Sequence, residues 1–199
     1  MLRPLLTLVL LVLFFTIAFG LRTWQQLRAT GHTGFHGISG RPGSAEWVGG
    51  VLFIVGIGLG ALAPIAELRG WVAPLWTPAP VLGTALTLLG ILTTHVAQIS
   101  MGRSWRIGVR ADDPTTLVVH GPFAVVRNPI FSCMLATSTG MTLLLPNALS
   151  LASIIALVVA IELQVRLVEE PHLLRTHGQS YRDYAATVGR FVPGLGRLA

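Results

Sequence analysis

The chain has 199 residues, of which 52% are hydrophobic and 11% are charged, and its mean hydropathy is +0.70. Soluble domains carry about 25% charged residues, so this composition excludes an ordinary water-soluble domain and indicates a membrane protein. The net charge of +6 comes from arginines that lie between apolar runs, not in one basic patch with aromatic residues. We therefore expect no nucleic-acid partner. The single cysteine, Cys133, excludes an internal disulfide and any multi-cysteine metal site.

The first apolar segment, residues 4–21, is close to the length of about 20 residues that a helix needs to cross a bilayer. Two interpretations are open, a membrane anchor and a cleaved signal peptide, because residues 18–20 weakly resemble a cleavage site. Positive charge is heavier after the segment, at Arg22 and Arg28, than before it, which is the reverse of a secretory signal. We therefore predict an anchor.

Four more apolar segments follow along the chain. The last two are separated only by Pro146 and Asn147, so we expect them to form an antiparallel helical hairpin. The predicted fold is all-α, an integral membrane protein with about five transmembrane helices. The second to fifth predicted spans are 47–68, 81–101, 129–145 and 148–165.

Five spans place the two termini on opposite sides of the membrane, and the distribution of arginine decides between the two orientations. With the C-terminus inside, twelve arginines lie in cytoplasmic segments and two lie outside. We therefore predict a bacterial-type plasma-membrane protein whose C-terminal polar segments face the cytoplasm. The twelve are Arg22, Arg28, Arg41, Arg103, Arg106, Arg110, Arg127, Arg166, Arg175, Arg182, Arg190 and Arg197, and the two are Arg3 and Arg69.

Glycine is frequent between residues 49 and 60 of the second predicted span. These glycines either form a face that another helix approaches closely or reflect the general abundance of glycine in membrane helices. No internal repeat is apparent. His32 and His36 lie in a glycine-rich loop without metal-ligand partners, so we expect no metal site.

Polar residues gather in two stretches, 102–129 and 162–184, which flank the predicted hairpin and are brought together by it. In the second stretch Glu162, Arg166 and the pair Glu169-Glu170 follow at helical spacings of three and four residues, which place them on one face. Ionisable groups near membrane depth normally face a cavity or a partner. The alternative is that Glu162 only pairs with Arg166 and that the glutamate pair marks where the helix leaves the bilayer.

The order of residues in these stretches is distinctive: Leu117-Val118-x-x-Gly121-Pro122-Phe123-x-x-x-Arg127-Asn128-Pro129-x-Phe131, then Glu169-Glu170-x-x-Leu173-x-x-x-x-Gly178-x-x-Tyr181-x-x-Tyr184 and a late Pro193. It resembles the isoprenylcysteine carboxyl methyltransferase and phospholipid methyltransferase superfamily of membrane enzymes. The resemblance covers about half of the chain. It implies a methyltransferase region at 102–199 with a C-terminal amphipathic helix, next to three N-terminal spans at 1–101.

The resemblance implies S-adenosylmethionine as cofactor, in a cytosolic pocket covered by the connecting loop and the C-terminal helix, with a tunnel that opens laterally to lipid. The cofactor's ammonium and ribose hydroxyls need carboxylates, which Glu169 or Glu170 could supply. Its carboxylate needs Arg127 or backbone N–H groups of residues 118–123. Aromatic faces could accommodate the adenine or the sulfonium.

An acidic methyl acceptor would need an arginine, and Arg166, with Glu162 one turn before it, is the candidate. These two are the predicted catalytic residues. The predicted cofactor-binding residues are Leu117, Val118, His120, Gly121, Phe123, Arg127, Asn128, Pro129, Phe131, Glu169, Glu170 and Tyr181.

The chain departs from the family pattern at several positions. Asn128 stands where the family commonly has histidine, and Phe123 and Phe131 stand where it often has tyrosine. A histidine usual before the glycine is replaced by Thr115, although His120 is nearby. These changes put individual hydrogen bonds to the cofactor in question more than the pocket.

Three functions remain open from the sequence: a membrane methyltransferase, an NADPH-dependent enzyme like the sterol reductases, and a non-catalytic membrane scaffold. The glutamate pair favours a cofactor with an ammonium group and therefore the first. The acceptor could be the carboxylate of an isoprenylcysteine, a phospholipid amine, a quinone precursor or a small hydrophobic thiol. The expected partners are the bilayer and this acceptor, and we expect a monomer.

Overall fold

The computed structural model describes residues 1–35, 37–38, 40–106 and 116–198, so His36, Arg110 and Thr115 lie outside the described residues. The described elements are all helical, and bridge pairing is found at Phe35 and between Val126 and Gly189. The helices and short helical turns are α1 (Leu2–Phe15), η1 (Thr16–Leu21), α2 (Arg22–Thr30), α3 (Ala45–Leu68), α4 (Pro80–Ser100), η2 (Gly102–Ser104), η3 (Gly121–Ala124), α5 (Pro129–Leu144), α6 (Ala148–Leu163), η4 (Gln164–Glu169), α7 (Glu170–His177) and α8 (Gln179–Thr187).

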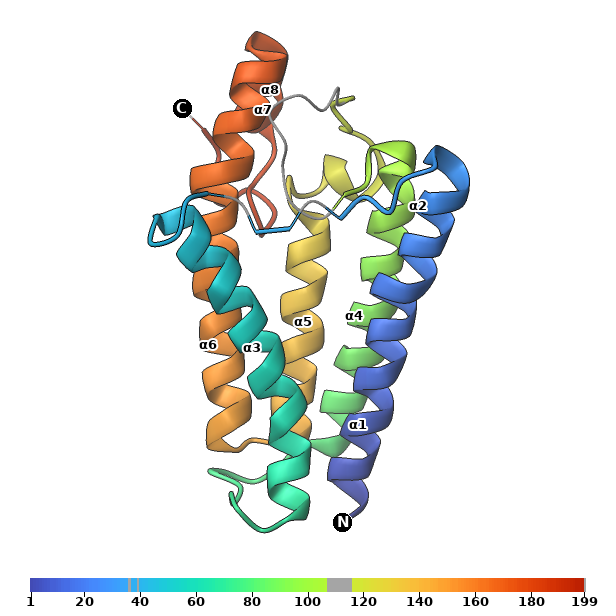
Figure 1. Cartoon of the computed structure of the whole chain (residues 1–199), viewed down its shortest axis with the longest axis vertical. Coiled ribbons are helices and arrows are strands. Elements are labelled where there is room, and N and C mark those ends of the chain that lie inside the picture. The colour runs from blue at the N-terminus through green and yellow to red at the C-terminus, as the bar shows by residue number, and fades with distance from the viewer. Residues whose placement is uncertain (36, 39, 107–115, 199) are drawn as a thin grey trace.

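Among the described residues, four helical segments are long and apolar enough to cross a membrane: Leu2–Thr30, Ala45–Leu68, Pro80–Ser100 and Ala148–His177. The fifth apolar helix, α5, is shorter, with 16 residues, and stands among the others in the bundle (Figure 1). The first and last segments are continuous because the π-helical turns η1 and η4 join their α-helical parts. The predicted all-α membrane fold is confirmed.

Local sequence explains where these helices begin. Ser44 caps α3 by accepting a hydrogen bond from the Trp47 backbone N–H at 3.2 Å. Asn147 caps α6 in a capping box with Ser150, directly after the chain turns at Pro146. This turn produces the predicted antiparallel hairpin of α5 and α6.

Two helix pairs build the bundle, because α3 packs along α6 and α4 packs along α5. Gly56 and Gly60 of α3 lie against Leu157 and Ser153 of α6, and the Ser153 hydroxyl donates to the Gly56 carbonyl at 2.7 Å. Gly58 instead faces open space. Part of the glycine-rich stretch therefore allows close helix approach, and part does not.

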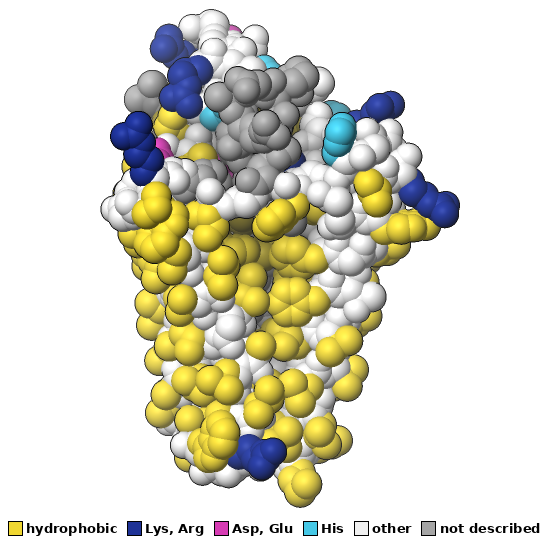
Figure 2. All heavy atoms as spheres, in the orientation of Figure 1, with side chains coloured by type: hydrophobic (Ala, Val, Ile, Leu, Met, Phe, Trp, Pro, Cys, Tyr) yellow, Lys and Arg dark blue, Asp and Glu magenta, His cyan; other side chains and the backbone are white. Residues whose placement is uncertain are grey.

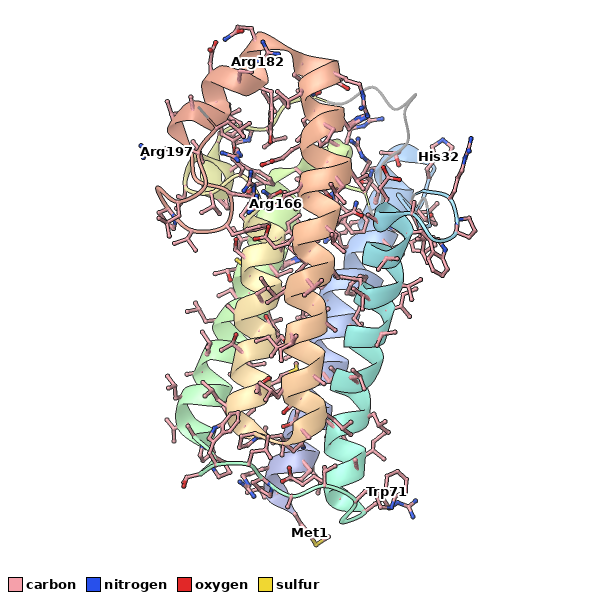
Figure 3. The ribbon with its side chains drawn as sticks, turned by 90° about the vertical axis from the view of Figure 1, so that its left-hand side faces the viewer. Met1, His32, Trp71, Arg166, Arg182 and Arg197 are labelled. Atoms are coloured by element: carbon pink, nitrogen blue, oxygen red, sulfur yellow. The ribbon has the colours of Figure 1, made fainter. Side chains whose placement is uncertain are left out.

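The two ends of the bundle differ in charge, with a belt of hydrophobic side chains between them (Figure 2). Met1 and Trp71 lie at one end, and His32, Arg182 and Arg197 lie at the other (Figure 3). The predicted grouping of the C-terminal segments with the loop after α4 at one end is therefore present in the structure.

The segment between α2 and α3 corrects one reading of the sequence, because it does contain a short internal repeat. Glycine recurs at every third position from Gly31 to Gly43, and all five of these glycines have φ between +74° and +85°. Only glycine adopts this left-handed conformation routinely, so glycine suits each of these five positions. The segment crosses the arginine-rich end from α2 to α3 (Figure 1).

Gly140 of α5 tests the close packing of α4 on α5. A Cβ atom there would lie 2.6 Å from the Thr87 backbone nitrogen and 2.7 Å from the Gly83 carbonyl oxygen, so the helices would have to separate. We expect Gly140→Ala to destabilise the protein by about 1–3 kcal/mol, measured by thermal unfolding in detergent. Gly58→Ala is the control and should not destabilise. Equal stability of the two variants would contradict this packing.

Candidate active site

A cavity of about 720 Å³ lies between the two helix pairs at the arginine-rich end. Its polar part is lined by residues of the 102–128 segment, η4, α7 and α8, such as Glu169, His172 and Tyr181. Its apolar part is lined from inside the bundle by residues such as Phe53 of α3 and Met134 of α5. Figure 2 shows a furrow between hydrophobic side chains on this face of the bundle. The cavity therefore offers a polar and an apolar compartment that join.

The structure brings nine of the fourteen predicted site residues to this cavity, and five do not line it. The nine are Leu117, Val118, Phe123, Arg127, Asn128, Pro129, Phe131, Glu169 and Tyr181. The five are His120, Gly121, Glu162, Arg166 and Glu170.

Glu170 is buried in an ion cluster with two arginines. Its carboxylate accepts hydrogen bonds from Arg190 Nε at 2.8 Å, Arg190 Nη2 at 2.9 Å and Arg127 Nη2 at 2.7 Å. Arg127 Nη1 also donates to the carbonyls of Ala185 and Val188, at 2.9 and 2.6 Å. The cluster joins the start of α5, the start of α7 and the C-terminal segment.

These bonds correct the prediction that Glu170 binds the cofactor. Glu170 is only 6% exposed and does not line the cavity. Its carboxylate already accepts three charge-assisted hydrogen bonds. Arg127 lines the cavity, but its two terminal nitrogens are engaged with Glu170 and three backbone carbonyls. Hydrogen bonding to Glu170 also raises the pKa of Arg190.

Glu169 takes a different direction from its neighbour. Successive residues of a helix point about 100° apart, so fixing Glu170 on the arginines leaves Glu169 to face the cavity. There it lies within hydrogen-bonding reach of the Gln164 side chain and close enough to Arg106 for electrostatic attraction. Among the described lining residues, Glu169 is therefore the one that brings a carboxylate to the cavity.

The predicted catalytic pair, Glu162 and Arg166, also needs correction. The two side chains form an ion pair with each other and are 39% and 55% exposed. Neither lines the cavity, because this face of the helix points away from it. The structure thus agrees with the alternative reading, a simple i,i+4 pair. His120 and Gly121 are exposed as well.

Two tyrosines of α8 fix the loop that covers the cavity. The Tyr184 hydroxyl donates to the Phe123 carbonyl at 2.6 Å, and the rings of Tyr181 and Tyr184 meet edge to face at 6.2 Å. Burial raises the pKa of each tyrosine to about 12. Both hydroxyls therefore stay neutral near pH 7 and can act as hydrogen-bond donors.

Helix α2 holds the segment that follows α4, a role that the sequence did not reveal. Arg22 donates to the Gly102 carbonyl, and its guanidinium lies 4.9 Å from the centre of the Trp105 ring. Gln26 donates to the Arg103 carbonyl at 2.8 Å. Trp105 in turn lines the cavity. Arg22 ends an apolar run, so its position near membrane depth was the available signal.

The helical bundle and its cavity define an integral membrane protein with a candidate site at one end, and comparison with known proteins identifies its family. The family model of phospholipid methyltransferases matches residues 78–180. The chain belongs to the phospholipid methyltransferase family, which confirms the resemblance read from the sequence.

Individual relatives share the family region. The chain is 29% identical over 115 residues to the nickel-cobalt-cadmium resistance protein NccN of Alcaligenes xylosoxydans xylosoxydans, covering 57% of this chain and 53% of that protein. It is 32% identical over 114 residues to protein-S-isoprenylcysteine O-methyltransferase B of Arabidopsis thaliana, covering 56% and 57%. The chain thus spans about half the length of these relatives.

The fold is also found in a solved structure. The eukaryotic intramembrane Ras methyltransferase, an isoprenylcysteine carboxyl methyltransferase, matches with a TM-score of 0.53 at 22% sequence identity. The match covers 78% of this chain and 53% of that one. At this identity the likeness concerns the fold alone.

The ion cluster predicts a difference between two glutamates. Glu170→Gln removes the charge that balances two buried arginines, and breaking such a pair costs about 3–5 kcal/mol. Glu162→Gln removes one partner of an exposed pair, which is worth about 0–1 kcal/mol. We expect a large loss of thermal stability in detergent for the first variant and little for the second. Similar melting temperatures would contradict the cluster's structural role.

Proposed function

We propose that the protein transfers a methyl group from S-adenosylmethionine to a lipidic or small hydrophobic acceptor. One observation carries the proposal: the cavity joins a polar compartment that presents Glu169 to an apolar compartment inside the bundle. A charged cofactor and an apolar acceptor could therefore meet without leaving the protein. The family supports the reaction class.

The polar compartment fits S-adenosylmethionine by the chemistry of its lining. Glu169 would pair with the cofactor's ammonium, and the faces of Tyr181 and Phe123 would accommodate the adenine or the sulfonium. Residues 102–199 would thus supply most cofactor contacts, and residues 1–101 the membrane side of the cavity. When bound, the cofactor supplies a methyl group on sulfur, whose S–C bond breaks as the bond from methyl to acceptor forms.

The protein's own part in such a transfer is to position two reactants and exclude water. Holding reacting atoms at near-attack distance can remove about 7–11 kcal/mol from a barrier. The ion cluster of Glu170, Arg127 and Arg190 holds the cover of the cavity from one side. Arg22 and Gln26 hold it from the other. No covalent nucleophile is needed.

An NADPH-dependent reaction is less well supported by the lining. A nicotinamide phosphate would need cations, but among the described lining residues the arginines are Arg106 and Arg127. The two terminal nitrogens of Arg127 already donate to backbone carbonyls and Glu170. Arg106 is attracted to Glu169.

Binding to the product S-adenosylhomocysteine tests the cofactor. Glu169→Gln would leave the ligand's ammonium without a charged partner in a partly desolvated site, at a cost of about 2–3 kcal/mol, or roughly 30- to 150-fold in affinity. Isothermal titration calorimetry in detergent measures the affinity for S-adenosylhomocysteine, and a separate titration with NADPH tests the alternative cofactor. Glu162→Gln is the matched control and should bind normally. Unchanged affinity in a folded Glu169→Gln variant would refute this assignment.

We further propose that the cavity opens at the cytoplasmic face of the membrane. The support is the concentration of arginine at that end of the molecule. Reporter fusions at Thr77 and Ala199 should then give opposite results, with the cytoplasmic signal at Ala199. Cytoplasmic signal at both positions would contradict the five-span topology, which places three spans between Thr77 and Ala199.

A further inference from the structure

The apolar compartment of the cavity ends part-way down the bundle. In each of the five apolar helical segments the described lining residues run from the arginine-rich end to one deepest residue. On α3 the lining extends from Gly49 to Ile57 and on α5 from Pro129 to Met134, which is about 12 and 8 Å of helix at 1.5 Å per residue. The five deepest lining residues are Phe19 of η1, Ile57 of α3, Gln98 of α4, Met134 of α5 and Ala160 of α6.

Side chains that pack on the core of the bundle form a floor to this compartment. Phe19 and Met134 line the cavity and also pack against the buried cluster of Phe14, Ala18 and Ile91. The centre of the Phe19 ring lies 5.9 Å from the centre of the Phe14 ring. Phe19 and Met134 themselves are only partly buried, so a molecule in the cavity can contact them.

The other helix pair is closed at the depth of Ile57. Gly56 lies against Leu157 of α6, and a Cβ atom on Gly56 would be 2.8 Å from Leu157 Cγ. One turn deeper, Gly60 lies against Ser153. Leu157 is buried and does not line the cavity. The compartment is therefore closed beneath on both sides.

The volume of the cavity limits what fits beside the cofactor. Pockets of about 300–1,000 Å³ bury one drug-sized ligand, and this cavity has about 720 Å³ for both compartments together. S-adenosylmethionine is itself of this size, so the room left for an acceptor is small. One side of the compartment reaches the surface of the bundle at Ile54, which lines the cavity and is 58% exposed. An apolar tail thus has two courses, onto the floor or out past Ile54.

We propose that the methyl acceptor is a compact molecule whose apolar end rests on the floor formed by Phe19, Ile57 and Met134, so that these residues set the largest acceptor that binds. This inference rests on the proposed methyl transfer and narrows its acceptor from lipidic or small molecules to small ones. The side chains of an empty floor lack partner atoms and forfeit dispersion contacts, which an occupant restores. A tail that leaves past Ile54 makes its contacts with lipid and leaves those of the floor unmade.

A series of 4-alkylphenols, from 4-ethylphenol to 4-decylphenol, tests the floor by calorimetry in detergent on the protein saturated with S-adenosylhomocysteine. Met134→Ala deepens the floor. It should bind the longest members about 5- to 150-fold more tightly than the wild type does, because methylene groups are no longer forced into filled space. It should bind 4-ethylphenol much as the wild type does. Detergent takes up each probe equally in both titrations, so the ratio does not depend on it.

Met141→Ala is the matched control. Met141 packs against the same buried cluster from the same helix but does not line the cavity. The length preference of this variant should therefore be that of the wild type. A shift like that of Met134→Ala would overturn the inference, because loosening of the cluster and not the floor would then set the limit.

Ile57→Phe tests the floor in the opposite direction and decides alone if Met134→Ala does not fold. The larger side chain takes up room in the cavity, so it should weaken binding of the longest members and spare 4-ethylphenol. An equal effect on all members in the folded variants would overturn the inference, because the tail would then leave past Ile54. No binding of any member to the wild type would also overturn it. If the wild type binds no S-adenosylhomocysteine, the proposed function fails instead, and the probe series without it still tests the floor.

Discussion

The buried carboxylate of Glu170 is the interaction on which the cavity depends. Two arginines from distant parts of the chain, Arg127 and Arg190, meet on it. Charges taken out of water are costly unless they are paired and hydrogen-bonded, so these three residues have to come together as the chain folds. The C-terminal segment is thereby held against the start of α5, where it helps to cover the cavity. The same bonds turn Glu169 inward.

Below this cover, the packing of glycines sets where the bundle is closed and where it is open. Gly83, Gly90 and Gly140 allow α4 and α5 to touch through their backbones, and Gly56 allows α3 to approach α6. Each pair is therefore tight. Between the pairs, larger side chains such as Phe53 and Met134 line a space instead of filling it. The cavity is thus a consequence of close packing within the pairs.

The sequence predicted the helices well because hydropathy over about 20 residues depends on the bilayer and not on tertiary contacts. It also identified the pair of Glu169 and Glu170. It did not predict that Glu170 is buried on two arginines while Glu169 lines the cavity. The two arginines that fix Glu170 are Arg127 and Arg190, 43 and 20 residues away, and no local spacing predicts these contacts. Arg166 was overvalued, since a spacing of four residues from Glu162 is sufficient for a surface ion pair. Gln98 of α4, which also lines the cavity, was overlooked because one polar residue in an apolar run changes neither hydropathy nor period.

The two π-helical turns show how the outer helices deliver polar groups to the cavity. A π turn contains one residue more than an α-helical turn, so it shifts the facing of the residues that follow it. In η4 this change of register lies directly before the point where Glu169 and Glu170 diverge. In η1 the Ala18 carbonyl accepts the bond that orients Gln98. One turn lies in the first membrane segment and one in the last. The polar groups on both sides of the cavity therefore lie beside local departures from the α-helix.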